Sequence, residues 1–436
     1  MSRPLSLNGS SNRPVSSDPK AEFDPLSVTI DCRSLAAVEN GTQVHALGLT
    51  LALAARDDVR VRALTPPDLD AQAADLFSAA GVEMLSYDEA IRAPSRTSIV
   101  HRPEQMNTIH DQNLLLTLGE TLVVTQQDLI AYRHGSYHET DEFWQRYRDS
   151  ARDSLRAADR ALFFSATTLD EATADGLVDP EFASVVGIGV DVPAVLQNAR
   201  PGSVRPDEVD PETPFLLFLG TDLEHKNRPF ALKLMTALID QHGWPGNLVI
   251  AGPRAALGGT EATERGILAS SPELAERVVT LGSVSNDEKQ WLLANAAAVI
   301  FPSTEEGFGL IPFEAALAGT PCAFAAVSSL AEVLPPDEAM IVPWDAGQSA
   351  AALMAVLTDT QVAARQTTAL VEASRAHSWE ATAAATVSAY RESLATPRPA
   401  AQSTPADQGG PRGVKRLVPL PVRRVIGSVR RSLRRS

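Results

Sequence analysis

The feature that most constrains the fold is a repeated alternation of short, apolar, β-branched runs with longer segments of helical character. Residues 26–35 (LSVTIDCRSL) are typical of a strand, 39–45 (ENGTQVH) of a turn and 46–58 of a helix. A strand–turn–helix unit that repeats predicts a sheet of parallel strands covered by helices. Further strands are expected at 60–65, 98–103, 121–128, 160–166 and 183–191, and helices at 68–81, 139–159 and 167–175.

The alternation stops once and then starts again. Residues 197–213 (QNARPGSVRPDEVDPET) are rich in proline and polar residues and poor in apolar ones, which is typical of a linker. Beyond them, strands are expected at 214–221, 247–253, 278–284 and 297–303, with helices at 227–243, 271–278 and 286–296. Two similar α/β halves joined by a linker predict a cleft, and ligands of such sheets bind at the carboxyl ends of the strands.

The stretch 301–321 (FPSTEEGFGLIPFEAALAGTP) carries the clearest chemistry. Gly307 and Gly309 allow a tight turn and close approach of a ligand to the backbone. Pro312 suits the first turn of a helix, so the turn should present free N–H groups to an anion. Glu314 in that first turn has an alternative explanation, because a carboxylate there complements the helix dipole. Glu306 has no helical role, and a carboxylate beside backbone donors suits a hydroxyl-rich ligand that carries phosphate.

These residues resemble the signature of the retaining glycosyltransferases of family 4. The resemblance lies in the Glu306–Glu314 spacing, the intervening Gly307-Phe308-Gly309-Leu310 and the following Gly319-Thr320-Pro321. It extends to 218–227 (FLGTDLEHKN), 328–333 (SSLAEV) and 377–394, and more loosely to the first half, so that it covers about residues 27–395. It implies the GT-B architecture, in which two Rossmann-like, doubly wound α/β domains face a central cleft.

The resemblance also implies the domain limits. We expect an acceptor-side Rossmann-like domain at 25–196, the linker at 197–213 and a nucleotide-sugar-binding domain at 214–376. A terminal helix at 377–396 should cross back to the first domain. Residues 1–24 are expected to be a disordered leader and 397–436 a disordered, basic, amphipathic tail.

The roles of individual residues follow from the resemblance by position. Glu306 is expected to bind the hydroxyls of the transferred sugar and Lys226 to neutralise the leaving diphosphate, so these two are the catalytic candidates. Glu314 is assigned to the ribose hydroxyls. The remaining donor-binding candidates are Gly307, Phe308, Gly309, Leu310, Ile311, Thr221, His225, Gly282, Val284, Gly41 and Thr42.

The chain departs from the family's pattern at two places. An arginine often assists the lysine of the phosphate loop, and here Thr221 and His225 occupy its usual positions. His225 would donate a charged hydrogen bond only when protonated, and an exposed loop residue is the alternative. A His-Asp pair is common in the first domain, where this chain has Gln127-Asp128. On the acceptor side the candidates are therefore Gln127, Asp128, His101, Tyr132 and Arg133, although ordinary loop polarity also explains them. Trp144 is expected to pack in the core or an interface.

Composition and charge exclude several other classes. Hydrophobic residues make up 44% and charged residues 21% of 436, as in soluble globular proteins. Cys32 and Cys322 are isolated, so they offer neither a disulfide framework nor a metal-site spacing. No apolar run approaches the roughly 18 residues of a membrane span, and the first twenty residues lack the apolar core of a signal peptide. We expect a cytoplasmic enzyme that needs neither metal nor cofactor.

The last 26 residues, 411–436, have a charge of their own. They hold nine of the chain's 38 Lys and Arg and no acid, so the net charge of −16 becomes −16 − 9 = −25 for the rest. A net charge this negative does not favour binding of nucleic acid by residues 1–410. Apolar residues at helical spacing among these arginines suit an anionic membrane surface, such as the inner face of the plasma membrane, and a solvated tail is the alternative.

The function expected is transfer of a sugar from a nucleoside-diphosphate sugar to a glycan or lipid-linked acceptor with retention of configuration. Two alternatives share the architecture. A nucleotide-sugar epimerase would need further acid–base residues, which the sequence does not reveal. A non-catalytic nucleotide-sugar-binding or scaffold protein is also consistent with the missing histidine and arginine, although the joint presence of Glu306, Lys226 and Glu314 argues against it.

Overall fold

The computed structural model describes residues 24–35, 41–106, 108–191, 203–396 and 398, and it gathers the chain up to Arg398 into one compact unit. The leader and tail expected at 1–24 and 397–436 therefore fall almost entirely outside the described residues, as do residues 197–202 of the expected linker. Within the described part, the strands form two separate sheets, one on each side of that linker in sequence. The domain limits within the compact unit stay predictions.

The first sheet has seven parallel strands in the order β3-β2-β1-β4-β5-β6-β7. The strands are β1 (Leu26–Asp31), β2 (Val59–Thr65), β3 (Glu83–Ser86), β4 (Thr97–Arg102), β5 (Gly119–Gln126), β6 (Arg160–Phe163) and β7 (Ala183–Val185). The helices between them are α1 (Gly41–Ala54), α2 (Ala71–Ala79), α3 (Tyr87–Arg92), α4 (Ile109–Leu118), α5 (Ile130–Arg133), α6 (Asp141–Ala157) and α7 (Ala166–Ala174). The short helical turns η1 (Gly135–Tyr137) and η2 (Pro180–Phe182) complete this half.

The second sheet has five parallel strands in the order β10-β9-β8-β11-β12. They are β8 (Phe215–Leu219), β9 (Asn247–Ala251), β10 (Val278–Gly282), β11 (Ala298–Phe301) and β12 (Cys322–Phe324). Its helices are α8 (Arg228–His242), α9 (Glu261–Ser270), α10 (Pro272–Glu276), α11 (Asn286–Asn295), α12 (Ile311–Leu317), α13 (Leu330–Val333), α14 (Ala346–Thr358) and α15 (Thr360–Ser374), with turns η4 (Glu224–Lys226) and η5 (Pro336–Glu338).

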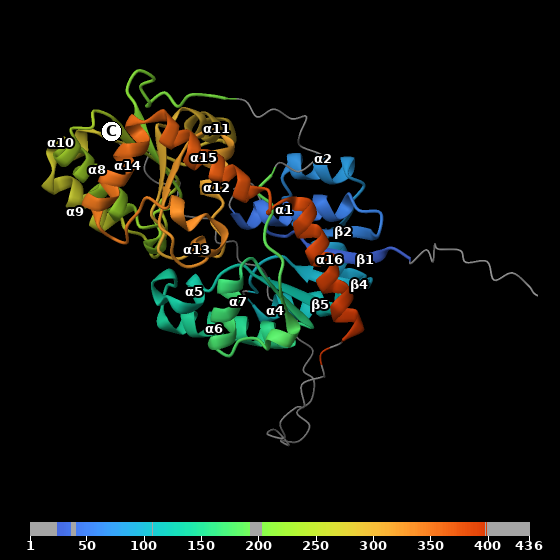
Figure 1. Ribbon diagram of the computed structural model, residues 1–436. Helices are drawn as coiled ribbons and strands as arrows, with labels where there is room; N and C mark the ends of the chain where they lie inside the picture. Colours follow the sequence, from blue (N-terminus) through green and yellow to red (C-terminus); the bar gives the residue numbers. More distant parts are fainter. Residues whose placement is uncertain (1–23, 36–40, 107, 192–202, 397, 399–436) are drawn as a thin grey trace, which may run out of the picture. The chain divides into compact units, whose positions relative to one another are not determined.

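Alternate residues of each strand in the second sheet pack on opposite layers of helices. Leu216 and Phe218 of β8 join the core around Phe230 of α8, whereas Leu217 and Phe301 join the core that contains Phe313 of α12. Figure 1 shows α8, α9 and α14 on one side of these strands and α11, α12 and α15 on the other. Both faces are covered, which is why these strands are continuous apolar runs in the sequence.

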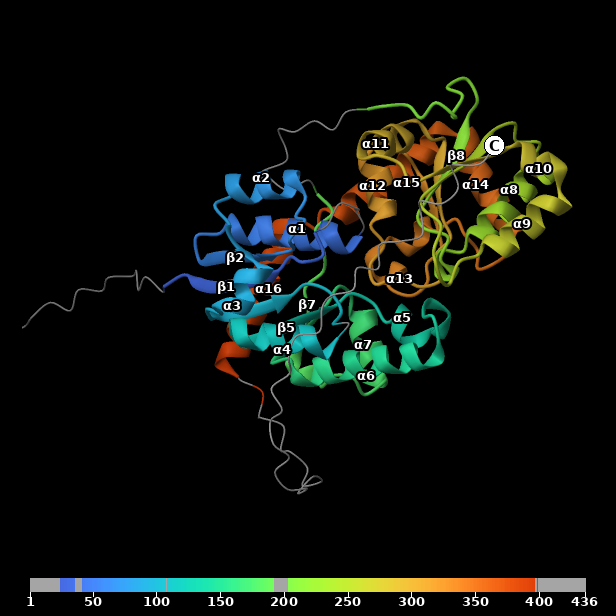
Figure 2. The same cartoon turned by 180° about the vertical axis from the view of Figure 1, so that it is seen from behind.

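The last helix, α16 (Trp379–Ala395), packs against the first sheet rather than the second. It contacts α1, β5 and β6 (Figures 1 and 2). Trp379, at its start, is buried against Gly48 of α1 and Gly189, where a Cβ would overlap the indole ring. The buried residues of this helix belong to a hydrophobic core that also includes residues of the second half, such as Leu217 and Phe313.

One sequence expectation about the first half was wrong. Residues 39–45 were expected to form a turn, but α1 already begins at Gly41. Gln43 and His45 lie on its buried side, and the His45 ring packs edge-on against Phe164, with ring centroids 4.6 Å apart. These partners are distant in sequence, so their contribution to extending the helix is invisible in the local pattern.

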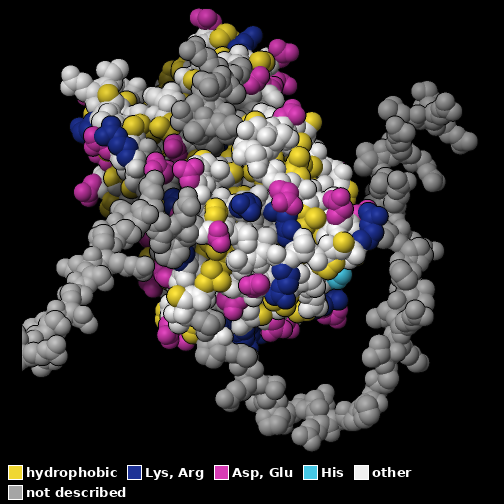
Figure 3. Space-filling view, turned by 90° about the vertical axis from the view of Figure 1, so that its right-hand side faces the viewer, with side chains coloured by type: hydrophobic (Ala, Val, Ile, Leu, Met, Phe, Trp, Pro, Cys, Tyr) yellow, Lys and Arg dark blue, Asp and Glu magenta, His cyan; other side chains and the backbone are white. Residues whose placement is uncertain are grey.

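On the face seen in Figure 3, acidic and basic side chains are interspersed and form no broad patch of one sign. Among the described residues, no helix has the length and apolar character that crossing a membrane requires.

Candidate functional site

The candidate site lies where the strand order of the second sheet reverses, between β8 and β11. Loops at the carboxyl ends of two such strands diverge, which is where doubly wound sheets bind ligands. The loop after β8 leads through η4 to Lys226, and the loop after β11 contains Glu306. The two loops are joined by Thr304, whose backbone N–H donates to the carbonyl of His225 at 2.8 Å.

Lys226 and Glu306 form an ion pair at the centre of this site. Lys226 Nζ lies 2.7 Å from Glu306 Oε1, and both side chains are largely shielded from solvent. The hydroxyls of Ser328 and Ser329 donate to the backbone carbonyl of Glu306, at 3.3 and 2.7 Å, and so fix the turn that carries it. A charged pair held this way offers one acceptor for hydroxyls and one cation for phosphate.

Glu314 occupies the first turn of α12 and has a partner that the sequence did not suggest. Lys289 Nζ, from α11, lies 2.9 Å from Glu314 Oε1 and 2.8 Å from Oε2, and it hydrogen-bonds to Oε1. The contact between α11 and α12 brings them together. The carboxylate is therefore anchored from one side, and both side chains keep about a quarter of their surface exposed.

Glycines bring the backbone of the loop after β8 close to its neighbours. A Cβ at Gly252, after β9, would overlap the carbonyl group of Gly220, after β8. Gly252 N–H also donates to the carbonyl of Gly282, at the end of β10. Gly220, Gly252 and Gly282 all have positive φ angles, which favour glycine. Thr221 follows Gly220 and is half-buried, as is Val284, which packs against the core.

Within 307–311 the residues differ in exposure. Phe308 is buried and packs edge-on against His377, with ring centroids 4.9 Å apart. Gly309 has a φ of 93° and contacts Leu330. Leu310 and Ile311 begin the helix and are partly buried against the core. The Phe308 side chain is thus occupied by packing and is not free to contact a ligand.

His225 is neutral at pH 7 in this environment. Burial, with the neighbouring Lys226 charge, lowers its pKa to about 4. The Tyr137 hydroxyl accepts from the His225 backbone N–H at 3.1 Å and lies 2.9 Å from Nδ1, so it is placed to donate to that nitrogen. The ring proton is then on Nε2. His225 can therefore donate a neutral hydrogen bond, but it does not replace the charge of the arginine often found there.

Gln127 is tied to the protein at both ends of its amide. Its Oε1 accepts from the Thr42 hydroxyl at 3.0 Å, and its Nε2 donates to the carbonyl of Pro103 at 2.9 Å. The same contact places Thr42, in the first turn of α1, beside the end of β5. Around Gly41, the described structure leaves open space where a Cβ would project.

Asp128 and Gly307 meet in this region. A Cβ on Gly307 would overlap the backbone carbonyl of Gln127 and would lie 3.2 Å from the Asp128 Cβ. Burial raises the pKa of Asp128, and the nearby Glu306 charge adds to the effect against the opposing hydrogen bond from Ile130 N–H. The structure thus brings Gln127 and Asp128 close to the loop that carries Glu306, and their assignment to the acceptor side stays a prediction.

The prediction for His101 was wrong. It was expected to line an acceptor site, but the residue is fully buried, with Nδ1 2.7 Å from the Tyr390 hydroxyl and Nε2 2.8 Å from the Thr125 hydroxyl. Burial lowers its pKa to about 3. Its partner Tyr390 belongs to α16 and lies 289 residues later in the sequence, so the residues around His101 do not indicate that it is buried. Tyr132 is also buried, and Arg133 pairs with Glu171 and Asp175.

Several contacts at the site were missed by sequence reasoning. Lys289 and Tyr137 lie in segments that were interpreted only as a helix and a polar loop. His134 Nε2 lies 2.8 Å from Glu305 Oε2, so Glu305 is not merely solvated. Glu332 accepts hydrogen bonds from the Ala166 and Thr167 N–H groups at the start of α7, at 2.8 Å each. No cluster of three or more His, Cys, Asp or Glu suited to a metal ion occurs among the residues that the structure describes.

Residues 203–374 match the family model described as glycosyl transferases group 1. This region is a group 1 glycosyltransferase domain. It contains Lys226, Lys289, Glu306 and Glu314, so the two ion pairs described above lie within the group 1 domain.

Curated relatives of the chain carry glycosyltransferase names. It is 26% identical over 256 residues to an MMP α-(1→4)-mannosyltransferase from Mycolicibacterium hassiacum, covering 58% of each chain. It is 30% identical to a D-inositol 3-phosphate glycosyltransferase from Catenulispora acidiphila, covering 50% of this chain and 52% of the relative. The chain spans between 30 and 58% of the length of the first three curated relatives that it matches.

Solved structures share the fold over most of the chain. A sucrose-phosphate synthase from Thermosynechococcus elongatus has a TM-score of 0.62 at 19% identity, covering 85% of this chain and 99% of that one. WaaG, a glycosyltransferase involved in lipopolysaccharide biosynthesis, has a TM-score of 0.56 at 14% identity, covering 83 and 99%. The chain that carries the group 1 domain therefore has the GT-B architecture, which confirms the expected fold class.

Proposed function

We propose that this protein is a glycosyltransferase that moves a hexosyl group from a nucleoside-diphosphate sugar to a saccharide acceptor. The observation that carries the proposal is the Lys226–Glu306 pair, 2.7 Å apart at the reversal point of the second sheet. The group 1 domain and the names of the curated relatives support the reaction class. A structure with the same fold, HepE from Anabaena, is described in complex with UDP and glucose and supports the donor class.

Each charged residue has a separate task in this proposal. Glu314, anchored by Lys289, accepts hydrogen bonds from the ribose hydroxyls. Glu306 accepts from hydroxyls of the transferred sugar and thereby orients it. Lys226, which pairs with Glu306 in the ligand-free protein, turns to the diphosphate as negative charge develops on it, because a cation there stabilises the leaving group.

We further propose that the configuration at the anomeric carbon is retained. The bond from that carbon to the diphosphate oxygen breaks, and a bond to the acceptor hydroxyl oxygen forms on the same face. The acceptor's proton passes to the departing diphosphate, so no protein base is required. Lys226 and backbone N–H groups supply the positive potential, and we expect activity to persist in excess EDTA.

The experiment is a panel of nucleoside-diphosphate sugars incubated with the protein, with release of nucleotide as the readout. With at least one donor, nucleotide should be released slowly by hydrolysis when no acceptor is present. Release should be faster, through sugar transfer, when a matching saccharide is present. Proton NMR of the product then reports its anomeric configuration. Measurable nucleotide binding with no turnover of any donor would instead favour the non-catalytic alternative.

The acceptor is proposed to be a glycan or a lipid-linked saccharide, reached at the inner face of the plasma membrane. The argument for the membrane is the basic segment 411–436, which lies outside the described residues. Deleting it should abolish pelleting with anionic liposomes while leaving donor hydrolysis unchanged. Equal pelleting by the shortened and full-length chains would contradict this part of the proposal.

A further inference from the structure

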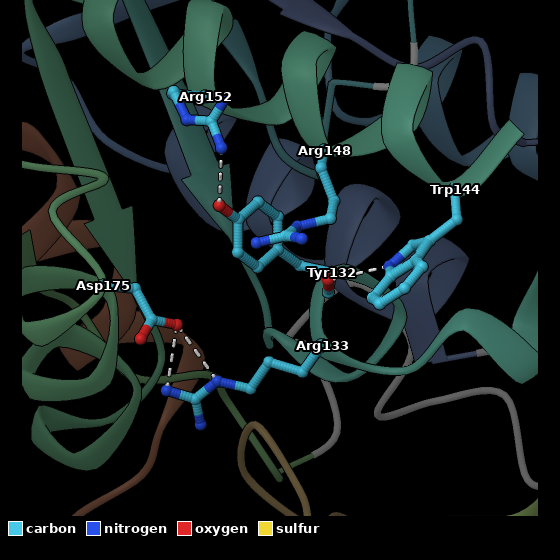
Figure 4. A pocket seen from close by; sticks show the side chains of 6 residues that line it. All are labelled: Tyr132, Arg133, Trp144, Arg148, Arg152 and Asp175. Atoms are coloured by element: carbon cyan, nitrogen blue, oxygen red, sulfur yellow. Dashed lines mark hydrogen bonds and ion pairs between the residues drawn. The ribbon is translucent and has the colours of Figure 1, made fainter. Parts of the chain in front are cut away.

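A cavity of about 370 Å³ lies in the first half of the chain, and none of the residues that line it is assigned to the donor. It is lined by Tyr132, Arg133, Trp144, Arg148, Arg152 and Asp175, from α5, α6 and the residue that ends α7 (Figure 4). The volume is at the lower end of the range for small-molecule sites. None of these residues contributes to the Lys226–Glu306 or Lys289–Glu314 pairs.

The charges around this cavity are unequally matched. Arg133 pairs with Glu171 at 2.9 Å and with Asp175 at 3.1 Å, and Arg152 pairs with the exposed Asp149 at 3.0 Å. Arg148 differs, because none of the carboxylates in the described part of the chain forms an ion pair with it. The cavity therefore has one guanidinium without a counter-charge.

Arg148 also has an unused donor. Its Nε is buried and has no hydrogen-bond partner among the described residues. A buried donor without an acceptor costs about 1–3 kcal/mol, so such groups in native proteins call for an explanation. An oxygen-rich anion entering the cavity would give the Arg148 guanidinium the counter-charge that it lacks.

Aromatic rings hold the Arg148 guanidinium in place. It lies over the Tyr132 ring, 4.7 Å from the centroid, and 5.2 Å from that of Trp144. Figure 4 shows the guanidinium stacked across Tyr132. The rings are themselves fixed, because Trp144 Nε1 donates to the Tyr132 carbonyl at 3.0 Å and Arg152 Nη2 donates to the Tyr132 hydroxyl at 3.3 Å. A stacked guanidinium loses little freedom on binding an oxyanion.

The segment that follows Arg133 connects this cavity to the two loops that carry Lys226 and Glu306. The residues that follow Arg133 reach the second half at three points. His134 lies 2.8 Å from Glu305, the Ser136 hydroxyl donates to Glu224 at 2.8 Å, and the Tyr137 hydroxyl lies 2.9 Å from His225 Nδ1. A ligand that contacts Arg133 would thus lie beside the segment that contacts the loops of Glu306 and Lys226.

We propose that this cavity binds an oxyanionic group, phosphate or carboxylate, carried by the saccharide acceptor. Assigning the anion to the acceptor rests on the proposed glycosyltransferase function, whereas anion binding by the cavity does not. Arg148 is the central ligand, since a guanidinium can engage two oxygens of one phosphate or carboxylate at once. Arg133 and Arg152 line the walls with their charges matched by carboxylates, so Arg148 is the arginine left to pair with the anion, and Trp144 offers an apolar face to the sugar ring.

The experiment is calorimetric titration of the full-length protein with glucose 6-phosphate, glucuronate and uncharged glucose. At least one charged sugar should bind, and glucose should bind at least tenfold more weakly. Arg148→Gln should weaken binding of that charged sugar at least tenfold. Arg156→Gln, which removes an exposed arginine from the same helix, should change it less than twofold. The Lys226→Met protein should still bind the charged sugar, which separates this cavity from the diphosphate site.

Three results would overturn the proposal. They are no binding of either charged sugar, equal binding of glucose, and equal binding by the Arg148→Gln protein. Thermal unfolding checks that the variant is folded, and Arg152→Gln serves as a second variant with the same expected direction. Donor hydrolysis is measured separately: if it fails while charged sugars still bind through Arg148, the glycosyltransferase proposal fails and the anion site stands.

Discussion

Lys226 Nζ and Glu306 Oε1 lie 2.7 Å apart, although the two residues come from loops that follow different strands and are separated by 80 positions in sequence. The pair neutralises two charges that a ligand-free site would otherwise leave unmatched in a partly buried position. Nucleotide-sugar binding should separate them, with the ammonium turning to phosphate and the carboxylate to hydroxyls.

Glu306→Ala should lower the rate of sugar transfer by at least about 100-fold, since it removes the acceptor that orients the sugar. Nucleotide binding, followed by calorimetry, should change less than about threefold. Glu305→Gln is the matched control, because its amide oxygen can still accept from His134 and the charge change is the same. A similar loss of rate in both variants would remove the special role of Glu306.

Lys226→Met should lower kcat for transfer by about 100- to 1,000-fold, because the leaving diphosphate loses its cation. Steady-state kinetics with the best donor measures the effect. Lys233→Met, which changes an exposed lysine of the following helix α8, is the control and should behave as the unmodified protein does. If kcat is unchanged and only KM rises, Lys226 acts in binding alone.

Glu314→Ala should raise the Kd for nucleoside diphosphates about tenfold, corresponding to the loss of roughly 1.4 kcal/mol of hydrogen bonding to ribose. The same variant should not change binding of inorganic diphosphate, which lacks ribose. Glu276→Ala removes an exposed carboxylate of α10 and is the comparison for net charge. Loss of inorganic diphosphate binding in Glu314→Ala would show that the helix start had been disturbed instead.

Gly307→Ala should reduce transfer strongly, because the added Cβ would overlap the Gln127 carbonyl and push the Glu306 loop away from the end of β5. Gly266→Ala is the opposite case, since a Cβ there meets nothing within 4 Å inside helix α9. That change should stabilise the protein by about 0.5–1 kcal/mol. Activity and urea unfolding of the two variants distinguish them, and a fully active Gly307→Ala protein would refute the contact.

Acid should destabilise the protein through its buried histidines. Burial lowers the pKa of His45 and of His101 to about 3, well below the unfolded value near 6.5. Below pH 6.5 the unfolded chain takes up protons that the folded chain does not, so stability is lost as pH falls. Each of the two should contribute a loss of about 2 kcal/mol between pH 6.5 and 5.

The measurement for this prediction is urea unfolding at several pH values, compared between the unmodified protein and His101→Gln. The glutamine can still hydrogen-bond to Thr125 or Tyr390 but does not titrate. Between pH 6.5 and 5, the free energy of unfolding of His101→Gln should therefore fall by about 2 kcal/mol less than that of the unmodified protein. Parallel pH profiles for the two proteins would contradict the assignment to His101.

The sequence predicted much of this protein because its signals are local. Continuous apolar runs such as 214–221 indicate strands buried on both faces, and the structure places β8 there. The Glu306–Glu314 spacing across two glycines and Pro312 indicated a loop followed by a helix start, and α12 begins at Ile311. Weaker patterns were missed, including β3 and the helices α3, α4 and α9, because their apolar spacing is short or mixed.

By itself, the sequence determined most of the alternation of strands and helices and the turn that places Glu306 before the helix of Glu314, since these depend on side-chain periodicity and glycine chemistry within a few residues. Only the tertiary structure decided which charges meet. Lys289 contacts Glu314, and Gly307 packs against Gln127. His101 is buried and lies within hydrogen-bond distance of Tyr390. Each contact forms because helices and loops from distant parts of the chain pack together. The physical reason is that packing and electrostatic contacts depend on distance in space, which the local pattern of residues does not specify.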